Sequence, residues 1–165
     1  MQIKEFLKLS VGKWFAQRTS YHLQEEKADN SKSEMTIELL APDAPELIQL
    51  CQQNQSDPKF TLATKTSWDN SVDWGKTKQT GATTIILLPD AENQQIGKLI
   101  TGEQKSGQYH LGEDEALTLI VEEGDNYFTE RIWFASENLR LRTTLVKNNH
   151  SFTMTAFYSE IRRVV

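Results

Sequence analysis

The fold prediction rests on three segments near the end of the chain: YFTERIWF at residues 127–134, NLRLRTTL at residues 138–145 and FTMTAFYSEIR at residues 152–162. Each segment is rich in β-branched and aromatic residues, and short polar stretches at residues 136–137 and 147–150 separate them. In the middle segment leucines alternate with arginines, as side chains do on the two faces of a strand. The three segments therefore predict consecutive antiparallel strands.

The same pattern continues toward the N-terminus. Further strand-forming runs lie at residues 14–23, 35–40, 60–68, 83–88 and 117–121. Short strands separated by turns every 8–12 residues or so predict a β-sandwich or a β-barrel. One or two short helices are expected near the front, at residues 3–9 and after residue 43. The prediction is an all-β, single domain over residues 1–165. It resembles the antiparallel calycin-type β-barrel of lipocalins and fatty-acid-binding proteins, which encloses a small ligand.

The second helix carries a start signal and an apolar face. Asp43 is predicted to cap the helix, and Glu46 three positions later would complete a capping box. Leu47, Leu50 and Cys51 share one face at helical spacing. The Cys51 thiol is therefore predicted to be buried and structural rather than reactive.

Composition excludes several classes of function. Lys and Arg number 18 against 23 Asp and Glu, a net charge of -5, which argues against a nonspecific nucleic-acid surface. One cysteine and three separated histidines give no metal-ligand spacing, so no metal is expected. No run approaches the ~18 apolar residues of a spanning helix, and no signal-peptide core is visible. A cytoplasmic protein without membrane insertion is expected.

The two arginines of the middle segment admit two interpretations. Arg140 and Arg142 either project into water, with the leucines inside, or line the barrel lumen as a two-armed anion site. In the second case Glu130 and Glu160, on the flanking strands, would orient them. A two-residue turn at residues 136–137 leaves Glu130 off the arginine face, whereas a three-residue turn places it there. A slip of one residue reverses every side chain, so the sequence leaves the register open.

An ordered set of motifs resembles the S-type phycobiliprotein lyases, the CpcS/CpeS family. The motifs are ERIWF at residues 130–134, NLRLR at 138–142 and SEIR at 159–162, with GKW at 12–14, QRT at 17–19, LC at 50–51, SW at 67–68 and LPD at 88–90. No single motif is specific. Their common order over nearly the whole chain carries the resemblance.

The resemblance implies a lyase that binds an open-chain tetrapyrrole, phycocyanobilin or phycoerythrobilin. The family attaches this bilin through a thioether to a cysteine of a phycobiliprotein α or β subunit. It needs no metal or further cofactor, because the bilin is the substrate. A homologous lyase subunit or a second copy of the chain is an expected partner, and cyanobacterial cytoplasm or plastid stroma the expected setting. The implied site residues are Glu130 and Glu160 as catalytic groups, and Arg140, Arg142, Trp68, Trp74 and Arg18 as bilin-binding groups.

Two departures from the family pattern lie near the expected pocket. Tyr158 precedes Ser159 where a small residue or cysteine is expected, and the residues after Trp68 are Asp69 and Asn70. Which bilin is carried, and which subunit accepts it, stays open. The main alternative is a non-catalytic, lipocalin-like carrier of a bilin or a fatty acid. Covalent transfer to an acceptor cysteine would separate these two functions.

Overall fold

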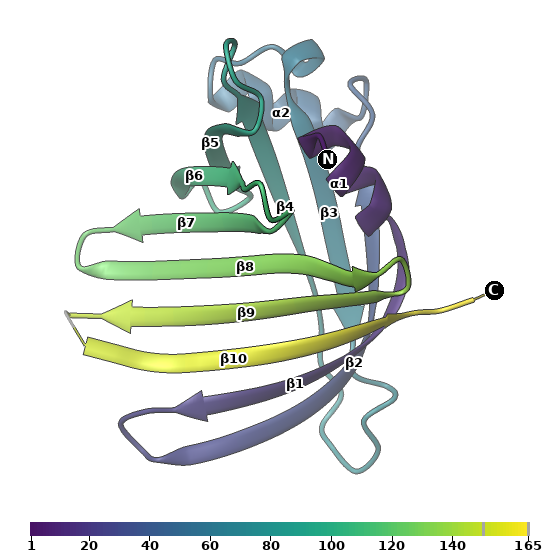
Figure 1. Ribbon diagram of the computed structural model, residues 1–165, viewed down its shortest axis with the longest axis vertical. Coiled ribbons are helices and arrows are strands. Elements are labelled where there is room, and N and C mark those ends of the chain that lie inside the picture. Colours follow the sequence, from purple (N-terminus) through teal and green to yellow (C-terminus); the bar gives the residue numbers. More distant parts are fainter. Residues whose placement is uncertain (150, 165) are drawn as a thin grey trace.

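Ten antiparallel strands close into a barrel in the computed structural model, which describes residues 1–149 and 151–164. Each strand pairs with its neighbours in the sequence, and the last strand pairs with the first, which closes the barrel. In Figure 1, β7–β10 cross the front of the molecule and β2–β4 pass behind them. The strands are β1 (Gly12–His22), β2 (Lys27–Leu39), β3 (Leu62–Asp69), β4 (Thr80–Pro89), β5 (Ile96–Thr101), β6 (Ser106–Leu111), β7 (Leu117–Glu123), β8 (Asn126–Ser136), β9 (Leu139–Asn148) and β10 (Ser151–Arg162).

The prediction of an antiparallel barrel with two short helices is confirmed. The helices are α1 (Ile3–Ser10) and α2 (Pro45–Gln53), and a single 3₁₀ turn, η1 (Pro58–Phe60), follows α2. That residues 1–165 form one domain stays a prediction. Within the described residues, no helix is long and apolar enough to cross a membrane.

Strands β5 and β6 were not among the strands expected from the sequence, and their glycines explain why. A side chain at Gly107 would place its Cβ 1.9 Å from the Ile120 carbonyl oxygen, and one at Gly97 would lie 2.3 Å from the Leu88 oxygen. Glycine is therefore required where these backbones approach closely. Each glycine also weakens the β-forming pattern of a strand only six residues long.

Helix α1 closes one end of the barrel. Ile3, Phe6 and Leu7 are buried and belong to the main hydrophobic core, together with leucines from β4 to β7. The Phe6 ring meets the Phe134 ring edge to face, with centroids 5.2 Å apart. The Trp14 indole donates a hydrogen bond to the Ser10 carbonyl oxygen at 2.9 Å. These contacts fix α1 against the starts and ends of the strands that surround it.

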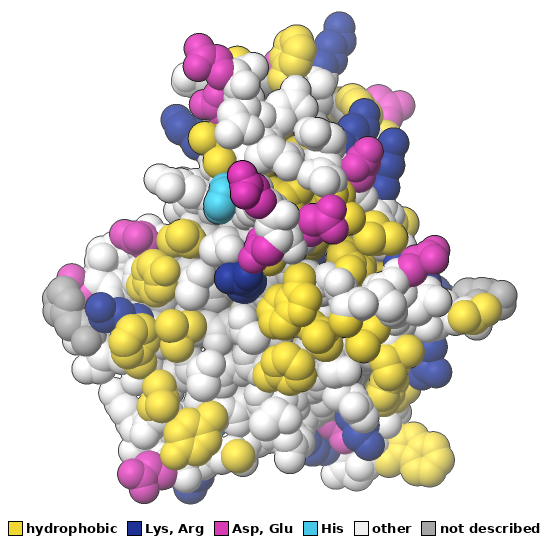
Figure 2. Space-filling model, in the orientation of Figure 1, with side chains coloured by type: hydrophobic (Ala, Val, Ile, Leu, Met, Phe, Trp, Pro, Cys, Tyr) yellow, Lys and Arg dark blue, Asp and Glu magenta, His cyan; other side chains and the backbone are white. Residues whose placement is uncertain are grey.

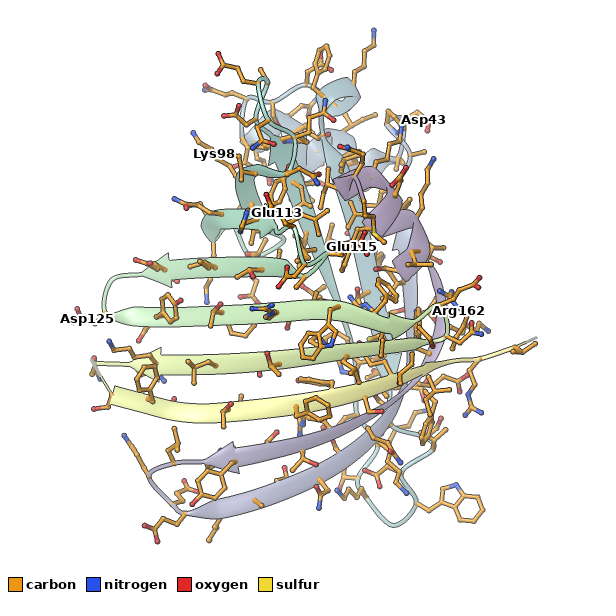
Figure 3. All side chains as sticks on the ribbon, in the orientation of Figure 1. Asp43, Lys98, Glu113, Glu115, Asp125 and Arg162 are labelled. Carbon is orange, nitrogen blue, oxygen red and sulfur yellow. The ribbon has the colours of Figure 1, made fainter. Side chains whose placement is uncertain are left out.

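The far end of β10 holds the C-terminal turn of α1. The Arg162 guanidinium donates hydrogen bonds to the carbonyl oxygens of Leu9 at 2.6 Å and Val11 at 2.8 Å. It also lies over the Trp14 ring, 4.2 Å from the ring centroid. Figure 3 labels Arg162 at this position. A cation at a helix C-terminus binds carbonyl groups that have no partner within the helix.

Helix α2 packs on the outside of the barrel. Leu47, Leu50 and Cys51 lie against Ala63 and other buried residues of β3 to β5, so the predicted apolar face is confirmed. The Cys51 thiol is buried. The predicted cap is wrong: the residue that caps α2 is Ala44, and no side chain caps the helix.

The Glu46 carboxylate is engaged elsewhere, which explains why no capping box forms. It accepts a hydrogen bond from the Thr84 hydroxyl at 2.6 Å and pairs with Lys65 at 3.4 Å. The Thr84 hydrogen bond is the main reason why the pKa of Glu46 lies below its ordinary value. The Glu46 carboxylate therefore binds side chains of β3 and β4 and not the backbone of α2.

Candidate ligand-binding site

A cavity of about 1090 Å³ occupies the interior of the barrel. Phe6, Leu7 and Ser10 of α1 line its closed end, and segments at residues 101–105 and 123–127 line the opposite end. Part of the wall is apolar, with leucines, valine and isoleucine from β4, β5 and β7. This volume lies at the upper end of the usual range for small-molecule pockets, so the cavity can hold a large ligand.

A bulge near the end of β8 decides which side chains face this cavity. Ser136 lies opposite Leu139 across a turn at residues 137–138, but Phe134 lies opposite Arg140. The extra residue between them shifts the alternation of β8 by one position. As a result Glu130 lies opposite Thr144, on the face that carries the arginines. Neither of the two turns considered from the sequence included this bulge.

Strand β10 meets β9 in the matching register. Glu160 lies opposite Arg140, and Tyr158 lies opposite Arg142. Arg140 is only 7% exposed, and both arginines line the cavity. The interpretation that places the arginines in the lumen is therefore confirmed, and the alternative with the leucines inside is wrong.

The leucines of β9 consequently face outward. Figure 2 shows hydrophobic side chains gathered over β8–β10, on the outer face of the barrel. The exposed large hydrophobic residues of β10 are Phe152, Phe157 and Ile161. Because β9 directs its arginines into the lumen, its leucines make this part of the outer face apolar.

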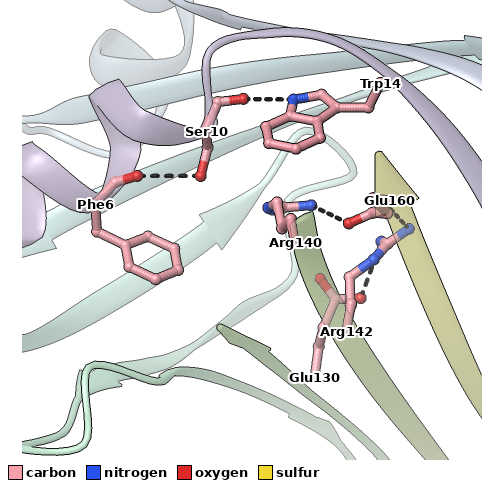
Figure 4. A network of polar contacts seen from close by, with 7 residues as sticks. All are labelled: Phe6, Ser10, Trp14, Glu130, Arg140, Arg142 and Glu160. Carbon is pink, nitrogen blue, oxygen red and sulfur yellow. Dashed lines mark hydrogen bonds and ion pairs between the residues drawn. The ribbon is translucent and has the colours of Figure 1, made fainter. Parts of the chain in front are cut away.

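Glu160 joins the two arginines, as Figure 4 shows. Its Oε1 accepts a hydrogen bond from Arg140 Nη1 at 2.5 Å, and its Oε2 accepts one from Arg142 Nη2 at 3.2 Å. The other terminal nitrogen of Arg142, Nη1, donates to Glu130 Oε2 at 3.3 Å. Two carboxylates and two guanidinium groups thus form one chain of charge-assisted hydrogen bonds.

Burial and pairing act differently on the two arginines. Burial lowers the pKa of Arg140, and the neighbouring Glu160 offsets this only in part. Burial also acts to lower the pKa of Arg142, but Glu130 and Glu160 together raise it above its ordinary value. Both guanidinium groups remain protonated, because arginine does not lose its proton in proteins. The network therefore keeps charged groups in a largely buried part of the barrel wall.

The two carboxylates are not equivalent. Glu160 is fully buried and does not line the cavity, and both of its oxygens bind arginines. Glu130 does line the cavity, and only its Oε2 has a hydrogen-bond partner among the residues described. Both were expected from the sequence to act as one pair of catalytic groups, whereas in the structure only Glu130 lines the cavity.

Donor capacity remains on the arginines. The Nε atoms of Arg140, Arg142 and Arg18 are buried, and none has a hydrogen-bond partner within residues 1–149 and 151–164. An unpaired buried donor carries a desolvation penalty that a bound acceptor would remove. Arg18 lines the cavity from β1, and its guanidinium lies 3.6 Å from the Asp29 carboxylate.

The two candidate tryptophans occupy different positions. Trp68 lines the cavity from β3, is 38% exposed, and lies opposite Gly81. A side chain at Gly81 would place its Cβ 2.4 Å from the indole, so this glycine makes room for Trp68. Trp74 is 91% exposed and does not line the cavity. Of the predicted site residues, the structure brings five together around the lumen: Arg18, Trp68, Glu130, Arg140 and Arg142. Glu160 lies behind them, and Trp74 lies apart.

The segment that carries Trp74, residues 70–79, shapes the open end. Asp73 accepts a hydrogen bond from the Lys32 backbone at 3.0 Å and pairs with Lys76 at 3.4 Å. Both residues line the cavity, and neither was expected from the sequence to belong to the site. No motif or periodicity marks such a loop, so the sequence held no signal for them. Tyr158, by contrast, shares its strand face with Glu160, and alternation alone would have added it to the site.

The comparisons with known proteins agree with one another. The family described as CpeS-like protein matches residues 2–163. A protein named chromophore lyase CpcS/CpeS, from Thermosynechococcus vestitus, is 42% identical over 98% of this chain and 93% of its own length. The phycocyanobilin lyase subunit CpcS of Picosynechococcus is 33% identical over 96% of this chain and 85% of its own length.

A solved structure gives the same result. The S-type phycobiliprotein lyase CPES of Guillardia theta is similar to this chain with a TM-score of 0.88 and 25% identity. The match covers all of this chain and 94% of that one.

Within the described residues, no group of three or more acidic, histidine or cysteine side chains is arranged to hold a metal ion.

Proposed function

The chain belongs to the CpeS-like protein family, and we propose that it is a chromophore lyase that attaches an open-chain tetrapyrrole to a phycobiliprotein subunit. The observation that carries this proposal is the buried Glu160–Arg140–Arg142–Glu130 network in the wall of a cavity of about 1090 Å³. Its relatives bear the name chromophore lyase.

The wall suits the chemistry of a bilin. A bilin carries two propionates, which accept hydrogen bonds, and basic pyrrole nitrogens, which bind a proton. The guanidinium groups of Arg140 and Arg142, which line the cavity, suit the propionates. The Glu130 carboxylate suits the pyrrole nitrogens, because a negative charge nearby favours the protonated tetrapyrrole. Trp68 adds an aromatic surface on β3, against which a conjugated ring system stacks.

The reaction needs no nucleophile from this chain. The acceptor cysteine adds across an unsaturated carbon of the bilin A ring: a sulfur–carbon bond forms, and the thiol proton ends on the tetrapyrrole. Nothing leaves, and no oxidant is consumed. Protonation makes the bilin more electrophilic, so Glu130 would assist the addition by stabilising that form. The barrel would contribute mainly by holding the bilin in one conformer.

Glu130 and Glu160 are assigned different tasks in this proposal. Glu130 touches the bilin. Glu160 is a positioning residue, because both of its oxygens are occupied by arginines. Arg140 and Arg142 bind the bilin through donors that Glu160 and Glu130 leave free.

The finer assignments follow from relatives. We take phycocyanobilin as the first ligand to test, since one relative is named a phycocyanobilin lyase subunit. The word subunit in that name also supports a homologous partner chain, with a second copy of this chain as the simpler possibility to test. An α or β phycobiliprotein subunit is the proposed acceptor, in the cytoplasm of a cyanobacterium or in a plastid stroma.

Covalent transfer is the decisive test. The purified protein is mixed with phycocyanobilin or phycoerythrobilin, and absorbance is recorded before and after addition of an apo-phycobiliprotein subunit. The products are then separated on a denaturing gel and viewed by zinc-enhanced fluorescence. A red-shifted, sharpened band followed by fluorescence on the acceptor supports the lyase and identifies its bilin. A spectral shift with no labelled acceptor, even with a homologous lyase subunit added, would instead make the protein a carrier.

A further inference from the structure

A row of side chains crosses the cavity wall beside the arginine network. Successive strand pairings place Ile132, Arg142, Tyr158, Arg18 and Ser31 opposite one another across β8, β9, β10, β1 and β2. All five line the cavity. Tyr158 is the central member, and it lies between two arginines.

Tyr158 has one occupied surface and one free group. Its ring lies under the Arg142 guanidinium, 3.7 Å from the Cζ atom to the ring centroid. Its hydroxyl makes no hydrogen bond to any residue within the described part of the chain, although Tyr158 is only partly exposed. The hydroxyl is not one of the buried polar atoms that lack a partner, so it keeps accessible surface. Because Tyr158 lines the cavity, the hydroxyl is a donor available to a ligand.

Its neighbours show which donors are left for a ligand at this row. Both terminal nitrogens of Arg142 already bind Glu130 and Glu160. Arg18, on the other side, has a buried Nε without a partner among the residues described, and a guanidinium 3.6 Å from Asp29. Besides the Arg142 Nε and the Ser31 hydroxyl, the donors of the row without a hydrogen-bond partner among the residues described are the Tyr158 hydroxyl and Arg18. These two lie opposite each other on β10 and β1.

We propose that the Tyr158 hydroxyl and Arg18 together bind one propionate carboxylate of the bilin. This inference rests on the proposed function. Residues directly opposite on paired strands have Cβ atoms about 5 Å apart, so both side chains reach the two oxygens of one carboxylate. The phenol adds a donor without adding charge, and its ring holds Arg142 flat against the wall. Tyr158 is thus a binding residue in its own right.

The test separates the carboxylate contact from a structural role. Tyr158→Phe keeps the ring that packs on Arg142 and removes only the hydroxyl. Affinity is measured by absorbance titration with two probes, phycocyanobilin and its dimethyl ester, which has no free carboxylate. Y158F is expected to bind the free acid about tenfold more weakly, the usual size for a lost hydrogen bond to a charged group, and to bind the ester as the unchanged protein does.

Two further variants complete the design. Tyr21→Phe removes a hydroxyl from the exposed face of β1 and should change neither affinity. Arg18→Gln should reproduce the pattern of Y158F, with a loss confined to the free acid, and it serves as the second route if Y158F melts at a lower temperature. Equal affinity of Y158F and the unchanged protein for the free acid would overturn the proposal. So would an equal loss for acid and ester, since that is a packing effect.

Failure of this inference is distinct from failure of the proposed function. The titration measures binding alone, so a carrier that never labels an acceptor would still show the dependence on the carboxylate. A lyase that labels its acceptor but is indifferent to Y158F would leave the proposed function standing and remove this subsite. Absence of binding by the unchanged protein to either probe would overturn both.

Discussion

The closed end of the barrel and the arginine-bearing wall beside it are both buried, but they treat their polar groups in opposite ways. Phe134 and Arg140 lie opposite each other at the boundary between them. At the closed end, the Trp14 indole and the Ser10 hydroxyl both have hydrogen-bond partners. One row further in, guanidinium nitrogens are left unpaired. The closed end stabilises the fold, whereas the wall keeps donors for a ligand and lowers stability by doing so.

The largest effect is expected from removing the aromatic contact at the closed end. Trp14→Ala should lower the free energy of unfolding by about 3–5 kcal/mol, because Trp14 is fully buried against Phe134 and Arg162. Urea unfolding followed by circular dichroism measures this loss. Trp133→Ala, on the outer face, is the matched control and should lose much less. Similar losses in both variants would mean that the closed end has no special part in stability.

The wall should respond in binding. Arg140→Ala or Arg142→Ala is expected to weaken bilin binding by about 1.5–3 kcal/mol, the range for hydrogen bonds to a charged group. Absorbance titration gives the dissociation constants. Arg131→Ala removes an arginine of β8 that pairs with Asp114 outside the cavity, and it should bind as before. Unchanged affinity in both cavity variants would separate the network from the ligand.

The two carboxylates provide a sharper comparison within the wall. Glu130→Gln should lower the pH at which the bound bilin loses its proton, because the carboxylate that favours the protonated form is gone. Transfer should slow about tenfold or more. Glu160→Gln should instead lower the free energy of unfolding by about 1–3 kcal/mol, since it leaves buried arginine donors poorly paired. Spectra recorded across pH, with Glu122→Gln as the control, test this difference; identical spectral effects of E130Q and E160Q would contradict it.

The tryptophans should differ by a smaller amount. Trp68→Ala is expected to weaken bilin binding by about 1 kcal/mol, a typical value for an aromatic stacking contact. Trp74→Ala should have a weaker effect, because Trp74 does not line the cavity. The same titration measures both. A larger loss in W74A would show that the segment at residues 70–79 folds over the ligand when it binds.

No effect on transfer is expected from Cys51→Ser. The Cys51 thiol lies on the buried face of α2, 3.6 Å from the Thr61 hydroxyl and outside the cavity. The zinc-stained gel gives the readout. Loss of transfer with bilin binding intact would make Cys51 a transient carrier of the bilin.

Short sequence patterns correctly predicted the features that depend only on residues close together in the chain. The alternation around Arg140 and Arg142 identified a strand with two unlike faces, and helical spacing identified the buried face of α2. These signals lie within a few residues of each other. The ordered family motifs then pointed to the lumen, the side that the structure shows.

What the sequence could not give depends on contacts between distant segments. The bulge in β8 decides the position of Glu130, and no residue type marks it. Asp43 had the composition of a cap, but Glu46 found partners on β3 and β4. The exposure of Trp74 depends on the path of a loop. The difference between Glu130 and Glu160 appears only when both strands are in register with β9.

The hydrogen bonds of Arg162 to the end of α1 link two elements that lie far apart in the sequence. Helix α1 is synthesised before the strands, but the Arg162 side chain that binds its final turn follows some 150 residues later, on the strand that pairs with β1. At 5–20 residues per second this interval lasts roughly 7–30 s. Until β10 is present, one edge of β1 lacks the partner that it has in the folded barrel. The barrel therefore cannot close until β10 has been synthesised, and the chain before that point is the state most exposed to aggregation.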